Sequence, residues 1–264
     1  MTLATTHLPE ELARALPAQR TGIPVRAVGL SLSIESRPIL QNIDLEISRG
    51  RFVALLGANG AGKSTLLKIL STLNAPTSGT LELFGVSAAS AAAQSRRHIG
   101  LIGHQTMLYH DLSALENLTF FAKLYDLRHP RERAMELLTQ LGLAHRAGDP
   151  VKAFSRGMAQ RVAIARALLH EPELLLADEP FAGLDAPSSA MLERLLKELH
   201  ASGKTIILAN HDIAQSLRLA ERAVVLAGGR KVIDAPAGSL DSSLVLARME
   251  SAAPVMADVD GGVV

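Results

Sequence analysis

The stretch that decides the fold is Gly57-Ala58-Asn59-Gly60-Ala61-Gly62-Lys63-Ser64-Thr65. It follows the apolar run 52–56 and precedes a segment with a helical pattern, 66–70. A strand, a glycine-rich loop and a helix in this order are typical of a phosphate-binding loop. Glycine tolerates positive φ, so successive backbone N–H groups can point into one concavity, next to the positive end of the helix. The stretch therefore predicts a binding site for the phosphates of a nucleotide.

Three side chains of this loop have predicted roles. Lys63 is expected to place its ammonium group on the β- and γ-phosphates. The hydroxyl of Ser64 is expected to bind Mg²⁺, and the hydroxyl of Thr65 to donate a hydrogen bond to a phosphate oxygen. The loop thus predicts a nucleoside triphosphate bound together with Mg²⁺.

Composition excludes several classes of protein. The 264 residues, 48% of them hydrophobic, suffice for one large domain or two small ones. Lys and Arg number 27 against 26 Asp and Glu, so charge offers no argument for a nucleic-acid partner. The absence of cysteine excludes disulfides and thiolate metal sites. Neither a signal pattern at residues 1–7 nor a run of about eighteen apolar residues is present, so we expect a cytosolic protein that reaches a membrane only through a partner.

Strand-like and helix-like segments alternate along the chain, which predicts an α/β fold. The predicted strands are 25–33, 39–47, 52–56, 80–85, 99–105, 174–179, 205–209 and 223–226. The predicted helices after the phosphate loop are 113–124, 131–141, 157–170, 187–200 and 213–219. Residues 87–93 suit either the start of a helix or a loop, and Gly228-Gly229 predicts a hairpin turn.

These segments predict three parts of the chain. Residues 1–22 form an extension and residues 23–235 the main domain, with a helical subdomain inserted at about 107–170. Residues 236–264 form a tail with a short helix at most. Ser113 and Glu116 have the spacing of a capping box, which predicts that a helix begins there.

Two carboxylates end an apolar strand at Asp178-Glu179, where α/β sheets place ligand sites. Asp178 is expected to hold Mg²⁺ through water, and Glu179 to orient and deprotonate the water that attacks the γ-phosphate. An Asp-Glu pair at a strand end is as often a helix cap or a solvated corner, and a lone histidine such as His211 is usually structural. The phosphate loop upstream favours the catalytic interpretation.

Over residues 25–235 the chain resembles the nucleotide-binding subunits of ABC transporters, whose motifs occur here in the family's order. They are the Walker A loop at 57–65, the Q-loop glutamine at Gln105, the signature at 154–161, Walker B with the catalytic glutamate at 174–179, the D-loop at 182–185 and the switch histidine at His211. The resemblance implies a P-loop NTPase core with an antiparallel β subdomain and an inserted α-helical subdomain. It also implies ATP and Mg²⁺ as cofactors, with Gln105 touching the metal ion.

The same resemblance implies partners. Ser155 and the amide of Gly157 would bind the γ-phosphate held by a second subunit; without the family, Ser155 is merely an N-cap before an amphipathic helix. One phosphate loop and one signature per chain imply a homodimer that encloses two ATP molecules. Integral membrane permease subunits would hold this dimer at the cytoplasmic face of the membrane, where it acts as an ATP hydrolase coupled to transport, a translocase.

Several residues depart from the family pattern. Ile34 stands where an aromatic side chain usually stacks on adenine, so we expect an aliphatic contact to the base and weaker discrimination against GTP. Arg156 replaces a usual glycine and Met158 a usual glutamine, while Ser155 and Gly157 are retained. Asn210 stands where a small hydroxyl residue is common.

The cargo is suggested by one stretch of sequence. Residues 103–118, together with 154–158, most resemble the ATPase subunit of the bacterial haem exporter of cytochrome c maturation. His104 and His110 are interpreted as solvated residues of the surface that contacts the membrane partner, and not as haem ligands. ATPases of drug, lipid or polysaccharide exporters, and the soluble ABC ATPase of iron–sulfur cluster assembly, remain alternatives.

Overall fold

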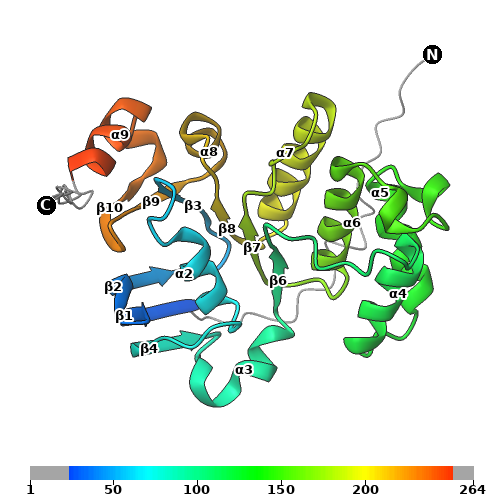
Figure 1. Cartoon of the computed structure of the whole chain (residues 1–264), viewed down its shortest axis with the longest axis horizontal. Helices are drawn as coiled ribbons and strands as arrows, with labels where there is room; N and C mark the ends of the chain where they lie inside the picture. The colour runs from blue at the N-terminus through cyan, green and yellow to red at the C-terminus, as the bar shows by residue number, and fades with distance from the viewer. Residues whose placement is uncertain (1–23, 252–264) are drawn as a thin grey trace, which may run out of the picture.

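The computed structural model describes residues 24–251. The predicted extension at 1–22 and the end of the predicted tail, 252–264, lie outside the described residues. Within residues 24–251 no helix combines the length and the apolar character needed to cross a bilayer. Two sheets and a group of helices make up the fold, and Figure 1 shows the helical group at one end of the molecule.

The larger sheet has the strand order β10-β9-β3-β8-β7-β6. Its members are β3 (Phe52–Gly57), β6 (Ile99–Ile102), β7 (Leu174–Asp178), β8 (Thr205–Ala209), β9 (Arg222–Ala227) and β10 (Arg230–Pro236). All neighbours are parallel except β9 and β10, which form the predicted hairpin over Gly228 and Gly229. Both glycines have positive φ, 55° and 75°, as the turn requires.

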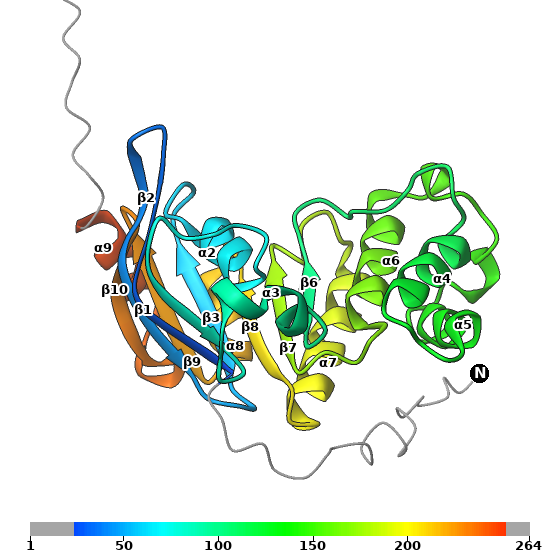
Figure 2. The ribbon, with the colours of Figure 1, turned by 90° about the horizontal axis from the view of Figure 1, so that it is seen from below.

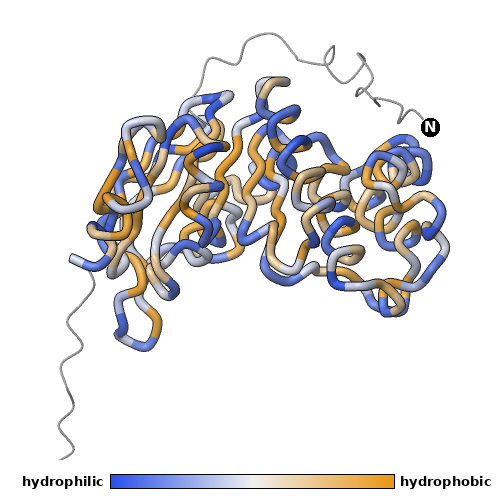
Figure 3. Tube along the Cα trace, turned by 90° about the horizontal axis from the view of Figure 1, so that it is seen from above, coloured by the Kyte–Doolittle hydropathy of each residue, from blue (hydrophilic) through white to orange (hydrophobic). Residues whose placement is uncertain are grey.

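Both faces of this sheet are covered, which explains its continuous apolar strands. On β7, Leu174 and Leu176 belong to the core on one face, and Leu175 and Ala177 to the core on the other. Figure 3 shows apolar residues concentrated along the central strands and hydrophilic residues along the outer helices and loops. The two faces of the sheet therefore anchor two separate groups of helices.

The smaller sheet is antiparallel, in the order β2-β1-β4-β5, and is the expected β subdomain. Its strands are β1 (Val25–Ile34), β2 (Arg37–Ile47), β4 (Ser78–Leu83) and β5 (Val86–Ser87). Helix α2 (Lys63–Leu70) packs between the two sheets through Leu66, Leu67, Ile69 and Leu70, all buried in one cluster with residues of β1, β2, β3 and β8. Figure 2 shows α2 in this position. The helix that follows the phosphate loop is thus held on both sides.

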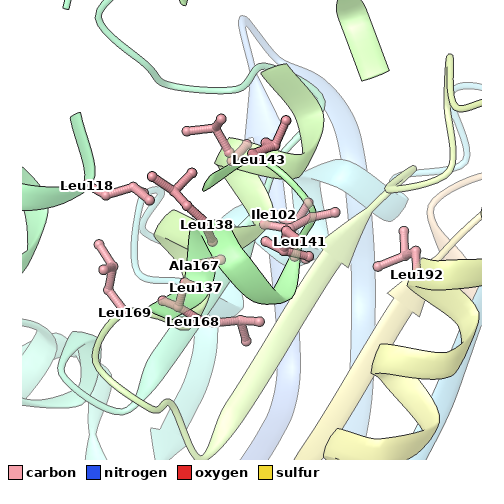
Figure 4. Packing of buried hydrophobic residues seen from close by; sticks show 14 of the residues in the cluster. Ile102, Leu118, Leu137, Leu138, Leu141, Leu143, Ala167, Leu168, Leu169 and Leu192 are labelled. Atoms are coloured by element: carbon pink, nitrogen blue, oxygen red, sulfur yellow. The ribbon is translucent and has the colours of Figure 1, made fainter. Parts of the chain in front are cut away.

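The inserted helical subdomain contains α4 (Ala114–Leu124), α5 (Pro130–Gln140) and α6 (Arg156–Leu168), with short 3₁₀ turns at Ala144–Arg146 and Val151–Ala153. Its leucines pack together in Figure 4, in a cluster that extends to the large sheet through Ile102. The predicted capping box is confirmed at the start of α4. The Ser113 hydroxyl accepts from the Glu116 N–H at 3.1 Å, and the Glu116 carboxylate accepts from the Ser113 N–H at 2.8 Å.

The remaining helices are α3 (Ala88–Arg96), α7 (Ala186–Ala201), α8 (Ile213–Leu219) and α9 (Ser242–Ser251), and a 3₁₀ turn covers Ala237–Ser239. Residues 87–93 were predicted to form either the start of a helix or a loop, and α3 shows that a helix begins there. In the segment after residue 236, α9 packs against β3 and β9 through Val245 and Met249. One predicted strand was too long: β6 ends at Ile102, so Gln105 lies in the loop that follows the strand.

A fully buried asparagine holds that loop in place. The carboxamide of Asn117 accepts from the backbone N–H of Tyr109 at 2.8 Å. Its NH₂ group donates to the carbonyls of Tyr109, Leu112 and Ser113 at 2.9, 3.2 and 3.0 Å. One side chain on α4 therefore contacts four backbone groups of residues 109–113. It is the partner of the Tyr109 N–H, and it adds a second hydrogen bond to three carbonyls that also accept from backbone N–H groups, those of Leu112, Val151 and Asn117.

We expect Asn117→Ala to lower the free energy of unfolding by about 1–3 kcal/mol, because a buried carboxamide with four hydrogen bonds is lost and the N–H of Tyr109 is left without its partner. Urea denaturation followed by circular dichroism measures this change. Thr139→Ala is the matched control, since it removes one exposed hydrogen bond on α5, from the Thr139 hydroxyl to the carbonyl of Met135. An equal effect of the two substitutions would contradict the role assigned to Asn117.

Candidate functional site

The phosphate loop connects β3 to α2 and depends on glycine at its last turn. Gly62 is the N-cap of α2 and has φ 102°, a left-handed conformation that other residues rarely adopt. A Cβ at this position would lie 2.6 Å from Cδ2 of Leu40 on β2. The loop can therefore press against the small sheet only with glycine at position 62, and this close packing positions the N-terminus of α2.

Lys63 is the first residue of α2 and is only 7% exposed. Its ammonium donates to the carbonyls of Gly57 and Ala58 at 2.7 and 3.1 Å. Burial lowers the pKa of Lys63, and the nearby carboxylates of Glu179 and Asp178 oppose this shift. The side chain is thus held across the loop, beside the two acidic groups predicted to act with it.

Asp178 ends β7 and is buried. Burial raises the pKa of this carboxyl group, while a hydrogen bond from Ser64 lowers it. Its Oδ1 atom is buried without a hydrogen-bond partner, as expected of an oxygen that faces a cation. Asp178 and Ser64 therefore fit a Mg²⁺ site. Among residues 24–251 no group of three His, Cys, Asp or Glu surrounds a possible metal site, so phosphate oxygens and water would have to complete the coordination.

Glu179 follows β7 with φ 51°, an uncommon conformation for a residue other than glycine. Its N–H donates to the carbonyl of Ala209 at the end of β8, at 2.8 Å. Its carboxylate lies 2.6 Å from Nδ1 of His211. Because β7 and β8 are neighbours in the sheet, two residues that are 32 positions apart in the sequence meet directly.

A cavity of about 680 Å³ opens over the phosphate loop. It brings together most of the predicted nucleotide-binding and catalytic residues with three further ones. Its lining consists of Asn59, Gly60, Ala61, Gly62, Lys63, Ser64, Thr65, Glu179 and His211, together with Ile39, His104 and Ala182. A volume of this size suits a nucleotide-sized ligand.

A second cavity, of about 320 Å³, lies between α2 and the loop that follows β6. Gln105 lines it together with Ser64 and Asp178, so the three predicted metal-binding residues share this space. His104 lines both cavities. It is exposed, as predicted, but its place beside the phosphate loop was not foreseen; its position next to Gln105 was the available signal.

Five predicted site residues line neither of these cavities. Gly57 and Ala58 lie at the start of the phosphate loop, where their carbonyls accept from Lys63. Ser155 caps α6, where its hydroxyl accepts from the N–H of Met158 at 3.3 Å, and Gly157 lies on the first turn of α6 near the carbonyl of Gly183. Neither residue lines either of the two cavities described above. Ile34 is 51% exposed at the end of β1 and lines neither cavity, whereas Ile39 on β2 lines the larger one.

Known proteins share this sequence and architecture. The profile of the ABC transporter family matches residues 40–182. The Nod factor export ATP-binding protein I of Cupriavidus metallidurans is 38% identical over 209 residues, which are 78% of this chain and 69% of that protein. The phosphonates import ATP-binding protein of Nostoc sp. is 40% identical over 222 residues, 80% of this chain and 91% of that protein.

Solved structures of ATP-binding cassettes also share this fold. A dimeric ATP-binding cassette in a post-hydrolysis state with ADP and Pi has a TM-score of 0.75 and 31% identity over 81% of this chain and 98% of that chain. The ATP-binding subunit of an ABC transporter has a TM-score of 0.79 and 30% identity over 86% and 99% of the two chains. With the phosphate loop, the neighbouring carboxylates and the two-sheet core in place, the chain belongs to the family of ATP-binding subunits of ABC transporters.

Proposed function

We propose that this chain binds Mg·ATP in the larger cavity and hydrolyses it to drive transport by a membrane complex. The single observation that carries the catalytic part of the proposal is the 2.6 Å contact between Glu179 and His211 above the phosphate loop. The contact joins Glu179, a proton acceptor, to His211, which is able to bind the γ-phosphate. Both lie beside the buried ammonium of Lys63 and the N-terminus of α2, which favours an anion.

Each residue has one task in this proposal. Lys63 offsets charge on the phosphates, and the backbone of residues 57–62 donates N–H groups to them. Ser64, Asp178 and Gln105 hold Mg²⁺, which neutralises charge that develops on the phosphate oxygens. Glu179 orients the attacking water and accepts its proton. Since Nδ1 of His211 is engaged with Glu179, Nε2 is the ring nitrogen left for a γ-phosphate oxygen.

A homodimer is part of the proposal. Ser155 and Gly157 stand at the N-terminus of α6, which suits an anion, yet they lie outside the chain's own cavity. The dimeric relative with ADP and Pi supports a second copy as the source of that anion. In such a dimer Ser155 and Gly157 of one chain would close the nucleotide site of the other.

A membrane partner is proposed from the exposed apolar residues beside the Q-loop. Met107, Tyr109, Phe120 and Leu124 are large, apolar and exposed on the loop before α4 and on α4 itself. Tyr109 and Phe120 pack edge to face, with ring centroids 5.4 Å apart. A patch of this kind suits contact with another protein, and we propose that permease subunits bind it and hold the chain at the cytoplasmic face of the membrane.

For the cargo, we propose haem exported for cytochrome c maturation, on the resemblance of residues 103–118 and 154–158 alone. The relatives named above export Nod factor or import phosphonates, so family membership by itself leaves both cargo and direction open.

For the base, we propose that Ile34 makes an aliphatic contact with adenine once the end of the β1–β2 hairpin approaches the nucleotide.

Glu179→Gln is expected to bind ATP normally and to lower the hydrolysis rate by about 10²–10⁴-fold, because the proton acceptor is lost while the phosphate loop stays intact. Lys63→Ala is expected to lose ATP binding instead. Fluorescent-nucleotide binding and phosphate release, measured on both variants, separate the two effects. Equal losses of binding in the two variants would contradict the assigned roles.

Ser155→Arg tests whether the signature acts on a second chain. Alone, this variant is expected to bind ATP without hydrolysing it, because the bulky side chain blocks the anion site at the start of α6. Mixed with Lys63→Ala, it is expected to regain partial hydrolysis, since each mixed dimer contains one site with an intact phosphate loop and an intact signature. A mixture as inactive as its components would refute the proposed dimer.

The transport proposal is tested by extracting membranes of the native host that contain tagged Glu179→Gln, using a mild detergent and ATP. Mass spectrometry is expected to identify permease subunits that copurify with this variant and are lost from a form with Tyr109→Asp and Phe120→Asp. Haem transport subunits among them would support the haem proposal, and a different permease would refute it. A purely soluble complex would favour the iron–sulfur alternative.

A further inference from the structure

One buried polar residue directly precedes His211 and takes part in none of the chemistry proposed above. Asn210 lies between β8 and α8 and is 1% exposed. Its Oδ1 accepts from the backbone N–H of His211 at 2.9 Å. Its Nδ2 donates to Oε1 of Gln215, on α8, at 2.8 Å. The side chain thus joins the backbone of the predicted switch histidine to a neighbouring helix.

The connection continues to α7. Nε2 of Gln215 donates to Oε1 of Glu193 at 2.8 Å, and Nη2 of Arg218 donates to the same oxygen at 2.7 Å. Glu193 belongs to α7, whose N-cap Asp185 ends the D-loop segment 182–185. A series of hydrogen bonds therefore connects the backbone of His211 through Asn210 and Gln215 to the helix that follows the D-loop, and the ring of the same histidine contacts Glu179.

The direction of this series is determined at both ends. A backbone N–H can only donate, so the amide of Asn210 must turn its oxygen toward His211 and its NH₂ toward Gln215. An ionised carboxylate can only accept, so Gln215 must turn its NH₂ toward Glu193 and its oxygen toward Asn210. Each amide has one permitted orientation, and the two requirements agree.

His211 itself depends on this support. Its ring is 70% exposed, and among the described residues the bond to Glu179 is the one hydrogen bond that its ring makes. The position of the ring is therefore set by the backbone of residues 210–212. We infer that Asn210 is a positioning residue, which holds the backbone of His211 so that the imidazole meets Glu179 and the γ-phosphate, and which links this position through Gln215 and Glu193 to α7.

The inference rests on the proposed roles of Glu179 and His211, and reversing the direction of the series tests it. Asn210→Asp keeps the acceptor for His211 but obliges Gln215 to turn its NH₂ toward position 210. The oxygen of Gln215 then faces the Glu193 carboxylate, and the series breaks. We expect kcat for ATP hydrolysis by the full chain to fall by about tenfold through misplacement of His211, with ATP affinity unchanged.

Glu193→Gln provides the rescue. By itself it is expected to leave kcat near the wild-type value, because the oxygen of the introduced amide can still accept from Gln215 and Arg218. Combined with Asn210→Asp, it lets Gln215 accept from the NH₂ of the amide introduced at position 193, while the exposed guanidinium of Arg218, which shares this contact, turns to solvent. The series then runs in the opposite direction, and most of the lost turnover returns. The double variant retains the extra carboxylate at position 210, so recovery excludes simple charge repulsion as the cause of the loss.

Two further measurements separate positioning from a general loss of stability. In a His211→Ala background, Asn210→Asp is expected to cause no additional loss of kcat. Ser202→Ala, which removes a hydrogen bond outside this series, from the Ser202 hydroxyl to the carbonyl of Leu199 at the end of α7, is expected to lower the melting temperature without lowering kcat.

The inference is overturned if Asn210→Asp hydrolyses ATP at the wild-type rate, if Glu193→Gln fails to rescue it, or if the loss persists without His211. If His211→Ala and Glu179→Gln themselves remain fully active, the proposed catalytic roles fail first. Measuring these two variants alongside the others therefore distinguishes failure of the inference from failure of the proposed function.

Discussion

The structure depends on holding one cation and two carboxylates together at the edge of an apolar core. Lys63 and Asp178 are buried, and Glu179 is mostly so. Burying isolated charges is costly, and here the cost is reduced because the charges face one another and because Lys63 donates to two backbone carbonyls. The two sheets on either side of α2 supply the apolar burial that holds this arrangement. A nucleotide with its metal ion would add further charges of both signs to this arrangement.

Strand order determines which residues meet. Strands β3, β8 and β7 are adjacent and parallel, so their carboxyl ends bring the phosphate loop, Asn210-His211 and Asp178-Glu179 to the same edge of the sheet. Ser155 and Gly157 are carried by α6, in the inserted subdomain, and are kept away from this edge. This separation fits our proposal that the core binds the nucleotide and that the inserted helices contact other subunits.

Relatives of this chain belong to transporters of opposite direction. Relatives that share the core are named for export in one case and import in another, although each aligns over most of this chain. Membership of the family therefore leaves both the cargo and the direction of transport open.

Local sequence alone determined the phosphate loop, the capping box at Ser113 and Glu116, the hairpin at Gly228-Gly229 and the alternation of buried strands with helices, because each depends on backbone preferences or on side chains a few positions apart. Only the tertiary structure decided that β6 ends at Ile102, that Asn117 holds the loop after it, and that Ile39 and His104 line the larger cavity. The same is true of Asn210, whose partners lie on other elements. These features arise from contacts between segments far apart in the chain, and single-sequence patterns carry no record of which distant segments become neighbours.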